Sequence, residues 1–539
     1  MYYPFLRSVI NGARRFQVDG IPKPIPPEGF FQHTFGRWAK DEASQLRRRY
    51  LEFNIDALKA ATVKAVDGAK SVTEMTKFHE TDFSKVFSLT LDNGQKVMAR
   101  LPTSMAGPAR LVTESQVATS EFARQRLGIP VPRTLAWCAD RDQTDVGAEF
   151  IIEEAPSGVD LCPQRWSTLS LAEKLGATRE VWKIEKKLLD NPMPAYGSIF
   201  FREDAESLEK HVEVDQTFVV GPSMDTSFWA DERAAMDIER GPWTDPYQFL
   251  VAICNREAQW INEYGRFQRL DPRFHQPDST HDPDAHLEAL ALFGQAIPYV
   301  VPSDEAFLQS TLAHPSGLDG SNIWISESAL AAGRIEITAI TDWQHAVASP
   351  LYLLGGLPAV IDLGDYQKKK QLQTMSNDKK NSHEFNQCAA EYDMLAKTEA
   401  FSYYETKTDE ELQLYATTAR SAVMIWGRSL HILRAKIYDI QRRWSDSEFP
   451  DPYYISDEKA DMWQAERKEW QEHWNVMRLF FPALSTYHEE GWIHPGQYDA
   501  ACENFVKMKE YWTANIGYNP ELLPFIDLAG KEQKTPVDE

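Results

Sequence analysis

The stretch from residue 75 to residue 101 alternates apolar and polar positions, which is typical of β-strands with one buried face. In its first part, the apolar positions that share a face are Phe83, Phe87, Leu89 and Leu91. The tripeptide Asp92-Asn93-Gly94 then has the composition of a tight hairpin turn. After the turn, the alternation resumes at Val97, Ala99 and Leu101. The pattern therefore predicts antiparallel strands joined by short loops.

A change of period follows this strand region. A helix is predicted from about Thr113 to Leu127, and Gly128 and the proline-containing run to Pro132 bring it to an end. Two further strands are predicted at Thr134–Cys138 and Glu149–Glu153. The resulting order, three strands, a helix and two strands, is that of the small lobe of a protein kinase.

Beyond Leu169 the pattern becomes mostly helical. The exceptions are Asn322–Ile325 and Ile335–Ile340, which predict a short pair of strands. Aromatic residues recur at helical spacing in Glu410–Trp444 and Ser456–Phe480, and we interpret them as core residues rather than as a cofactor-binding motif. We therefore expect an α+β, protein-kinase-like fold of two lobes: a small antiparallel-sheet lobe with one helix, and a large, mostly helical lobe.

Four consecutive segments are expected along the chain: an N-terminal extension at 1–40, the small lobe at 41–154, the core of the large lobe at 155–400, and a C-terminal helical part at 401–539 that packs on the large lobe. The extension contains Arg7, Arg14 and Arg15, and no acidic residue precedes Asp19. This composition matches a mitochondrial presequence and, equally, an ordinary polar terminus. The predicted location is the mitochondrion, with the cytoplasm as the alternative.

Composition narrows the classes of partner. The 539 residues carry a formal net charge of −23, which disfavours nucleic acid and anionic lipid as ligands and is compatible with a cationic small molecule. The five cysteines are scattered, without a Cys-x-x-Cys pair, so that neither a zinc site nor a disulfide framework is predicted. No apolar run approaches the ~20 residues that a transmembrane helix needs.

Phosphoryl transfer from ATP needs a loop over the phosphates, a cation, metal ligands and a base. The candidate loop is Phe78–Lys85, which contains no glycine, and a plain hairpin is the simpler interpretation. The candidate cation is Arg100 at the end of a predicted strand, with Gln116 on the following helix where a kinase has its paired glutamate. Lys85, in the candidate loop, and Glu154, where the small lobe ends, complete the predicted nucleotide-binding residues.

The predicted metal ligands are Asn322 and Asp342, because a loop that ends in asparagine, a short strand pair and an aspartate form the magnesium site of kinases. Taken singly, both residues are typical of turns. The histidine- and aspartate-rich run from His275 to His286 could also bind a metal, but no predicted helix or strand fixes its spacing, and we interpret it as a solvated loop.

At this point the sequence resembles a known family. The motifs that carry the resemblance are Gly36-Arg37-Trp38, Tyr50-Leu51-Glu52-Phe53-Asn54, Gly128-Ile-Pro-Val-Pro132, Pro194-Ala195-Tyr196-Gly197-Ser198, Glu239-Arg240-Gly241-Pro242-Trp243 and Asp342-Trp343-Gln344. From about Phe30 to Pro358 the chain is similar to the fungal phosphotransferase-enzyme family that includes altered inheritance of mitochondria protein 9. The resemblance implies an aminoglycoside-phosphotransferase-like domain that uses ATP and Mg²⁺.

The chain departs from the family's pattern at three places. The family has Glu-Gly-Gly-Phe-Asn-Lys where this chain has residues 80–85, Glu-Thr-Asp-Phe-Ser-Lys, and it has a glutamate where Gln116 stands. The family's His-Pro-Asp-Leu-His becomes His314-Pro315-Ser316-Gly317-Leu318-Asp319, so that Ser316 or Gly317 fills the position of the catalytic aspartate and the loop is one residue longer.

Asp319 is the remaining candidate for the catalytic base. It lies three residues before Asn322, whereas the family's aspartate lies five before, and two residues of chain span up to roughly 7 Å. The sequence thus favours a nucleotide-binding protein with impaired or lost phosphotransferase activity. The alternatives are an active small-molecule kinase that uses a displaced Asp319, and a non-catalytic scaffold for a protein partner.

Overall fold

The computed structural model describes residues 27–39, 41–265, 278–362, 378–426, 429–444, 453–483 and 491–515. The candidate presequence and residues 275–277 of the histidine-rich run lie outside these ranges. Within them the chain forms two compact units: the first comprises Glu52–Arg256 and Ile297–Val423, and the second comprises 27–51, Glu257–Ala296 and 424–515. The chain thus crosses between the units several times, whereas the sequence predicts four consecutive segments.

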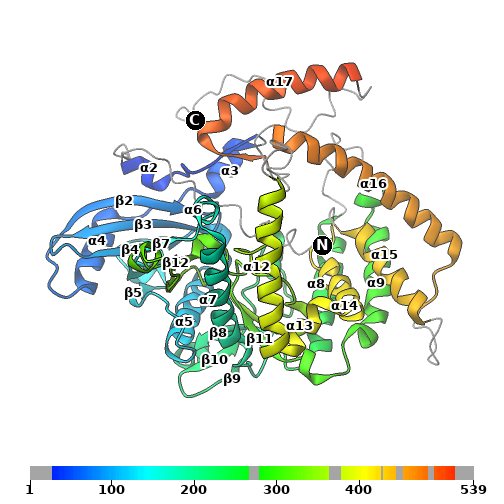
Figure 1. The fold of residues 1–539 in the computed structure, drawn as a ribbon, viewed down its shortest axis with the longest axis horizontal. Coiled ribbons are helices and arrows are strands. Elements are labelled where there is room, and N and C mark those ends of the chain that lie inside the picture. The colour runs from blue at the N-terminus through cyan, green and yellow to red at the C-terminus, as the bar shows by residue number, and fades with distance from the viewer. Residues whose placement is uncertain are drawn as a thin grey trace. The chain divides into compact units, whose positions relative to one another are not determined.

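The first unit contains a five-stranded antiparallel sheet with the order β2-β3-β4-β6-β5 (Figure 1). Its strands are β2 (Val72–Glu80), β3 (Ser84–Leu91), β4 (Lys96–Pro102), β5 (Thr134–Cys138) and β6 (Phe150–Glu154). At the predicted turn Gly94 has a positive φ of 81°, which glycine adopts without strain. The predicted strands and their order are therefore confirmed.

Two helices contact this sheet, α4 (Ile55–Ala65) and the predicted helix that follows β4. Helix α5 (Ala109–Gln125) lies between β4 and β5 in the sequence and packs against β5, β6 and a strand of a second sheet. It begins four residues before the predicted Thr113, because Pro108 in extended conformation precedes its first turn. Burial of α5 on several sides explains why its apolar periodicity is a weak guide to where it begins.

The remainder of the first unit is the large, mostly helical lobe. Its helices, two of which continue into the second unit, are α6 (Pro163–Thr168), α7 (Leu171–Leu189), α8 (Pro246–Glu263), α9 (Pro283–Val300), α10 (Glu327–Ala331), α12 (Asp378–Glu399), α13 (Phe401–Thr408) and α14 (Glu410–Ala422). Helices α7 and α12 run side by side (Figure 1). The predicted α+β, protein-kinase-like fold of two lobes is thus confirmed.

The large lobe contains more β-structure than the sequence predicts. Its strands are β7 (Val159–Asp160), β8 (Ser198–Phe201), β9 (Val212–Glu213), β10 (Phe218–Gly221), β11 (Ser310–Ala313), β12 (Ile323–Ile325), β13 (Ile337–Ile340) and β14 (Val347–Pro350). They form the sheets β8-β10-β9 and β13-β12-β7 and the pair β11-β14. The expectation of one strand pair after Leu169 was incomplete, because β8 and β10 are short and buried on both faces and so show no alternation.

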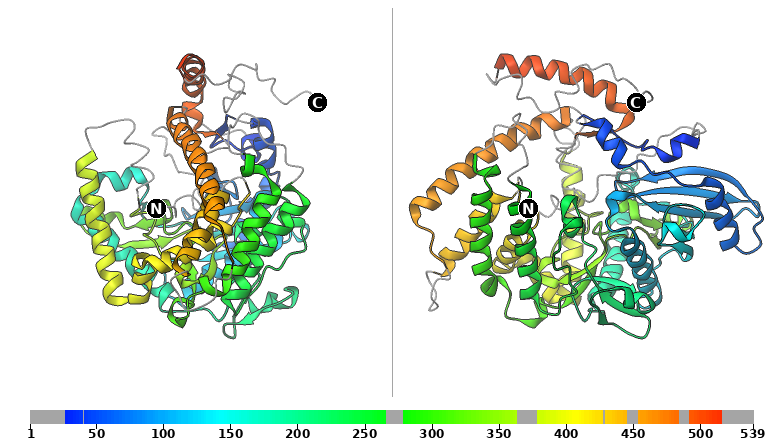
Figure 2. Two further views of the ribbon diagram at one scale, coloured as in Figure 1. Left: turned by 90° about the vertical axis from the view of Figure 1, so that its right-hand side faces the viewer. Right: turned by 180° about the vertical axis from the view of Figure 1, so that it is seen from behind.

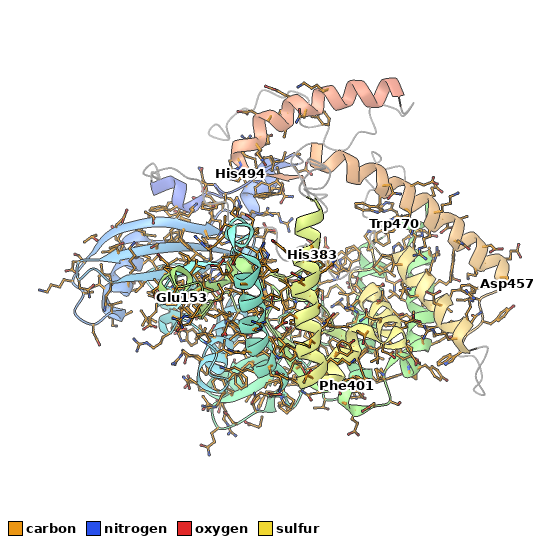
Figure 3. All side chains as sticks on the ribbon, in the orientation of Figure 1. Glu153, His383, Phe401, Asp457, Trp470 and His494 are labelled. Carbon is orange, nitrogen blue, oxygen red and sulfur yellow. The ribbon has the colours of Figure 1, made fainter. Side chains whose placement is uncertain are left out.

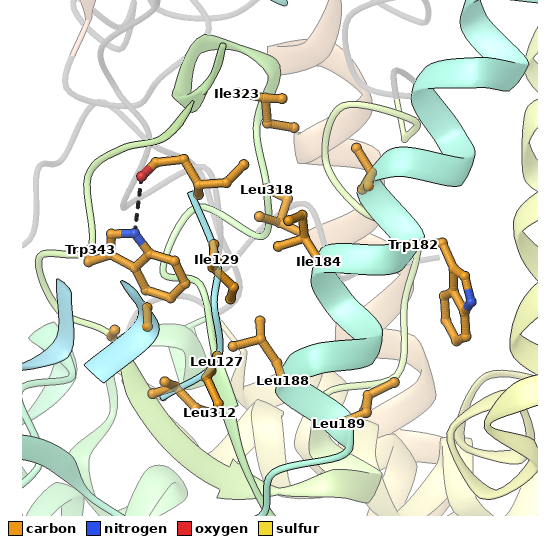
Figure 4. Packing of buried hydrophobic residues seen from close by; sticks show 14 of the residues in the cluster. Leu127, Ile129, Trp182, Ile184, Leu188, Leu189, Leu312, Leu318, Ile323 and Trp343 are labelled. Carbon is orange, nitrogen blue, oxygen red and sulfur yellow. Dashed lines mark hydrogen bonds between the residues drawn. The ribbon is translucent and has the colours of Figure 1, made fainter. Parts of the chain in front are cut away.

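A large apolar core fills the first unit and anchors the loops that follow β11 and β13. Figure 4 shows Leu188 and Ile184 of α7 near Leu312, Leu318 and Trp343. The indole Nε1 of Trp343 donates to the carbonyl oxygen of Ile340 at 3.2 Å. These loops therefore begin and end at buried side chains, which restricts their conformations.

The second unit is mainly helical. Its further elements are α2 (Pro27–Phe31), β1 (Arg37–Trp38), α3 (Glu42–Arg48), α15 (Leu430–Trp444), α16 (Asp457–Ala483), β15 (Trp492–Ile493) and α17 (Tyr498–Asn515). Strands β1 and β15 pair antiparallel. Two side views display α16 and α17 along their length (Figure 2), and Figure 3 marks Asp457 at the start of α16 and Trp470 further along it. Across the described ranges, no helix has the length and apolar composition to cross a membrane.

Two buried histidines of the second unit give it a predicted pH dependence. Burial, together with the nearby Arg434 guanidinium, lowers the pKa of His286 on α9 and of His431 on α15 to about 4. Because an unfolded histidine titrates near 6.5, the unfolded chain binds more protons than the folded one between these values. The contribution of neutral histidine to stability is therefore complete above about pH 6.5 and is lost as the pH falls towards 4.

We expect the second unit to unfold at lower urea concentration at about pH 4.5 than at about pH 7. Its free energy of unfolding should fall by up to ~3 kcal/mol for each histidine. Tryptophan fluorescence reports on this transition, because His431 lies 5.9 Å from Trp470 and His286 lies 4.7 Å from Trp426, between ring centroids. In the His286→Asn/His431→Asn double variant the acid-induced loss should shrink. An equal loss in both proteins would assign the effect to other groups.

Candidate functional site

The loop between β11 and β12 contains the candidate base. Its extra residue is absorbed at Gly317 and Leu318, which have successive positive φ angles of 60° and 57°. The amides of Ala359 and Val360 donate to the carbonyl oxygens of Gly317 and Leu318 at 2.7 and 3.1 Å. The Leu318 side chain lies in the core (Figure 4). Two backbone hydrogen bonds and one buried side chain therefore anchor the middle of the loop.

Ser316 is the centre of the hydrogen bonds within this loop. Its Oγ accepts from the amide of Asp319 at 3.2 Å and from the Asn322 side-chain Nδ2 at 3.1 Å, and it lies 3.0 Å from His314 Nδ1. His314 Nε2 lies 3.0 Å from the carbonyl oxygen of Thr341. Of the two residues that could fill the catalytic aspartate's position, Ser316 is thus the one whose side chain reaches the predicted metal ligand Asn322.

Asp319 faces a different partner. Its carboxylate accepts from the backbone amide of Ser321 at 2.9 Å and so caps the short 3₁₀ helix Gly320–Asn322. Gly320 holds this helix close to the preceding chain, because a Cβ there would lie 2.0 Å from the carbonyl oxygen of Leu161. The carboxylate of Asp319 is therefore used in local structure.

We expect Asp319→Ala to leave any ATP hydrolysis rate unchanged and to cost about 1 kcal/mol of stability through the lost cap. Asp319→Asn is the matched control, since asparagine also caps helices. Hydrolysis rates and urea unfolding of the three proteins decide the matter: a drop in rate of tenfold or more in both variants would restore Asp319 as the base.

The two predicted metal ligands lie at the same end of one hairpin. Ile323 of β12 pairs with Ile340 of β13, and the Thr341 amide donates to the carbonyl oxygen of Asn322 at 2.9 Å. Asn322 therefore directly precedes β12 where Asp342 follows β13. Because Nδ2 of Asn322 is bonded to Ser316, its amide oxygen points away from that hydroxyl and is available to another ligand.

Arg100 joins the small lobe to this hairpin end. Its Nη1 donates to Asp342 Oδ1 at 2.9 Å and to Ser84 Oγ at 3.0 Å, and the residue is 4% exposed. In strand β4 it lies opposite Val86 and Ile151, between two central strands of the sheet. A buried guanidinium bonded to a carboxylate that is 30% exposed makes a site of mixed charge that solvent reaches on the carboxylate side.

The candidate phosphate loop is a closed hairpin turn. Thr81 Oγ1 accepts from the amides of Phe83 and Ser84, both at 3.0 Å, and the Thr81 amide donates to the carbonyl oxygen of Ser84 at 2.9 Å. These amides are the groups that a glycine-rich loop would offer to phosphate. Phe83 packs on His345, with ring centroids 4.8 Å apart. The structure thus agrees with the simpler interpretation of this segment as a plain hairpin.

The other predicted nucleotide-binding residues lie in different surroundings. Gln116 is buried in α5, and among the described residues neither its Oε1 nor Arg100 Nε has a hydrogen-bond partner. Glu154, at the end of β6, has a half-exposed side chain that pairs with Arg133 at 3.2 Å. The structure thus brings Arg100, Asn322 and Asp342 together, and it forms no bond between Gln116 and Arg100 in the described part of the chain.

Lys85 belongs to a buried charge cluster of the β2–β3 hairpin. Its Nζ donates to Glu80 Oε1 at 2.6 Å, and the Nζ of Lys77 donates to the same oxygen at 2.8 Å. Burial, together with the neighbouring Lys85, lowers the pKa of Lys77 to about 8, and Glu80 opposes this shift. The two ammonium groups bound to one carboxylate stabilise the hairpin. The Lys85 ammonium is therefore already paired with Glu80.

Two residues of the site were missed by sequence reasoning. Ser84 bonds Arg100, and Thr341 supplies the carbonyl oxygen that orients His314. The available signals were indirect: Ser84 and Val86 share a face of β3, and Thr341 precedes the candidate Asp342. Serine and threonine at strand ends are too common for such positions to stand out.

The side chains at the site determine which metal it could hold. In the described ranges, no group of three or more histidine, cysteine, aspartate or glutamate side chains gathers at metal-binding distance. The donors at hand are the Asp342 carboxylate and the Asn322 amide oxygen, which are hard ligands of the kind that Mg²⁺ takes alongside substrate phosphates and water. The donor set therefore fits a Mg²⁺–nucleotide better than a free metal ion.

Several known proteins are similar to this chain in sequence. No family model matches the chain. A subtelomeric hrmA-associated cluster protein of Aspergillus fumigatus is 27% identical over 477 residues, which is 80% of this chain and 91% of that protein. Altered inheritance of mitochondria protein 9, mitochondrial, of Komagataella phaffii is 25% identical over 289 residues, which is 42% of this chain and 47% of that protein. The Candida albicans protein of the same name is 26% identical over 282 residues.

The similarity of this chain to solved structures is lower. The streptomycin–ATP ternary complex of APH(2″)-IIa superimposes with a TM-score of 0.38 and 10% identity, covering 71% of this chain and 99% of that one. The ADP-bound aminoglycoside phosphotransferase APH(2″)-Ib gives a TM-score of 0.36 and 12% identity, covering 72% and 96%. The resemblance predicted from the motifs is confirmed by sequence: the chain is similar to fungal proteins that include altered inheritance of mitochondria protein 9.

Proposed function

We propose that the protein binds a Mg²⁺–nucleoside triphosphate, ATP, at Arg100, Asn322 and Asp342, and that its phosphotransferase activity towards small molecules is impaired or lost. The observation that carries the proposal is the 2.9 Å bond between Arg100 Nη1 and Asp342 Oδ1, which brings a strand of the small lobe to the hairpin end that holds both predicted metal ligands. A kinase-type site combines a cation for phosphate with oxygen ligands for magnesium in this way.

Each side chain has a proposed part in binding. Asp342 and Asn322 would hold Mg²⁺ by one carboxylate and one amide oxygen, and Mg²⁺ would neutralise charge on the phosphates. Arg100 would turn from Asp342 towards a phosphate oxygen, for which its planar fork is suited. Gln116 leaves Arg100 without the negative partner that positions the equivalent lysine in kinases. Weak, Arg-dominated phosphate binding is the expected consequence.

Impaired chemistry follows from the base position. Ser316 has no carboxylate to accept the acceptor's proton, and Asp319 is used as a cap. Loss of a positioned base costs about 10²–10⁴-fold in rate. In the turn at Thr81, the amides of Phe83 and Ser84 donate to Thr81 Oγ1, so that they are not available to bind the phosphates. Binding with little turnover is therefore supported better than an efficient kinase.

The location and acceptor are further proposals. The names of the relatives in Komagataella phaffii and Candida albicans include "mitochondrial", which supports a mitochondrial location for this chain. The net charge of −23 supports a cationic acceptor for any residual transfer.

The proposed function is tested by separating binding from turnover. Thermal unfolding is followed with ATP and Mg²⁺, with ATP and a chelator, and with Mg²⁺ alone; stabilisation should grow with ligand concentration and need both components. Steady-state ATP hydrolysis is measured on the same samples and should stay near the buffer rate. Absence of any shift at millimolar Mg-ATP contradicts nucleotide binding, and rapid hydrolysis contradicts impaired chemistry.

A further inference from the structure

We propose that Ser316 is itself a phosphate acceptor: the γ-phosphoryl group of a bound nucleoside triphosphate is transferred to Ser316 Oγ, with His314 Nδ1 taking the proton. The inference rests on the proposed nucleotide binding. Ser316 stands where the family has its catalytic base. It cannot act as a carboxylate base, but its hydroxyl can accept one phosphoryl group.

The hydrogen bonds around Ser316 fix the direction of its proton. A serine hydroxyl has one donor and two acceptor sites. Ser316 Oγ accepts from Asn322 Nδ2 and from the Asp319 amide, so that its one remaining function is to donate to His314 Nδ1 at 3.0 Å. A hydroxyl that donates to an imidazole nitrogen at this distance has the geometry of a nucleophile with its general base.

The imidazole is oriented as a base requires. His314 Nε2 lies 3.0 Å from the carbonyl oxygen of Thr341, which can only accept, so that Nε2 carries the proton and Nδ1 accepts from Ser316. The ring packs edge-on against Trp343, with centroids 4.8 Å apart. Nucleophile, base and orienting group therefore form a continuous chain from Ser316 to Thr341.

This chain adjoins the proposed phosphate site. Asn322, whose Nδ2 bonds Ser316, is a proposed magnesium ligand, and Thr341, whose oxygen orients His314, directly precedes Asp342. Arg100, the proposed phosphate cation, bonds Asp342. The hydroxyl of Ser316 is thus one side chain away from the metal and from the phosphate that the metal would hold.

The proposed step is balanced. The oxygen of Ser316 attacks the γ-phosphorus, a new bond forms between Oγ and phosphorus, and the bond from phosphorus to the β,γ-bridging oxygen breaks. The hydroxyl proton passes to His314 Nδ1, and the nucleoside diphosphate leaves with its charge matched by Mg²⁺. The nucleoside triphosphate is the only co-reactant.

Burial sets the expected kinetics. Ser316 is 3% exposed and His314 is 5% exposed, so that the hydroxyl must be uncovered by a local movement of the loop before transfer. The same burial keeps water from the phosphoserine once it has formed. We therefore expect slow labelling that stops at one phosphate per chain, and no continuous release of inorganic phosphate.

The test incubates the full-length chain with Mg-ATP and maps phosphate by peptide mass spectrometry over time. The expected result is labelling confined to Ser316, at a rate independent of protein concentration. Ser316→Ala should abolish it while keeping the ATP-dependent thermal stabilisation. His314→Gln should slow it about 10²–10⁴-fold. Ser321→Ala, a neighbouring serine of the same loop, should label as the unchanged chain does.

The outcomes separate the inference from the proposed function. Stabilisation by Mg-ATP without phosphate on Ser316 overturns the inference and leaves nucleotide binding standing. Phosphate on another residue, or equal labelling rates with and without His314, also overturns it. If Mg-ATP does not bind at all, both the inference and the proposed function are wrong.

Discussion

Replacing Ser316 by aspartate is expected to raise the rate of ATP hydrolysis by about 10²-fold or more. The reason is positional: the Ser316 side chain already meets the Asn322 amide at 3.1 Å, so that a carboxylate on the same Cβ would lie beside the proposed magnesium ligand. A positioned general base contributes about 10²–10⁴-fold to such a transfer. The measurement is steady-state phosphate release with saturating Mg-ATP.

Two control variants make this result specific. Ser316→Asn has the shape of aspartate without a base and should remain at the background rate, as should Ser316→Ala. If Ser316→Asp hydrolyses ATP no faster than Ser316→Asn, although both bind Mg-ATP, then the base position is not what limits turnover. The longer loop, with its two successive left-handed residues, would then be the cause to pursue.

Removal of the Asp342 carboxylate is expected to have the second largest effect. Asp342→Ala leaves the buried Arg100 guanidinium without its 2.9 Å partner, which should cost about 3 kcal/mol in the free energy of unfolding of the first unit. It also removes one of two proposed magnesium ligands. Binding of ATP should therefore lose its dependence on Mg²⁺, which is measured by calorimetric titration with the metal and with a chelator.

Stability and metal binding are separated by a second pair of variants. Asp342→Asn keeps an acceptor for Arg100 and should lose magnesium dependence at a smaller cost in stability. Arg100→Met combined with Asp342→Ala removes both charges and should recover part of the lost stability, because no unpaired charge stays buried. A magnesium dependence that survives in Asp342→Ala would remove this residue from the metal site.

The fold was predictable where the sequence shows a period and a punctuating turn. Strands β3 and β4 alternate cleanly on either side of Asp92-Asn93-Gly94, and β5 was predicted with its observed ends. Strand β8 was not predicted, because Ser198–Phe201 is short and mostly buried, and its partner β10 lies beyond β9 in the sequence. A short apolar segment does not reveal by its sequence whether it is strand or helix.

The residues of the site were easier to predict from the sequence than the hydrogen bonds between them. Arg100, Asn322 and Asp342 were expected from the order of elements, and Arg100 and Asp342 prove to be bonded across 242 positions of sequence. The hydrogen bonds of Ser316 could not be predicted, since they depend on two left-handed residues, one of them the non-glycine Leu318. The Asp319 carboxylate accepts a hydrogen bond from the neighbouring backbone, and this cap competes with any catalytic use of the same carboxylate.

The central claim is tested most directly by an experimental structure of the chain with Mg²⁺ and a non-hydrolysable ATP analogue. We expect the metal to be bound by the Asp342 carboxylate and the Asn322 amide oxygen, the Arg100 guanidinium to contact a phosphate oxygen, and the γ-phosphate to face the loop from His314 to Asn322. A nucleotide bound elsewhere, or an Arg100–Asp342 bond that persists with the phosphates out of reach of both side chains, would contradict it.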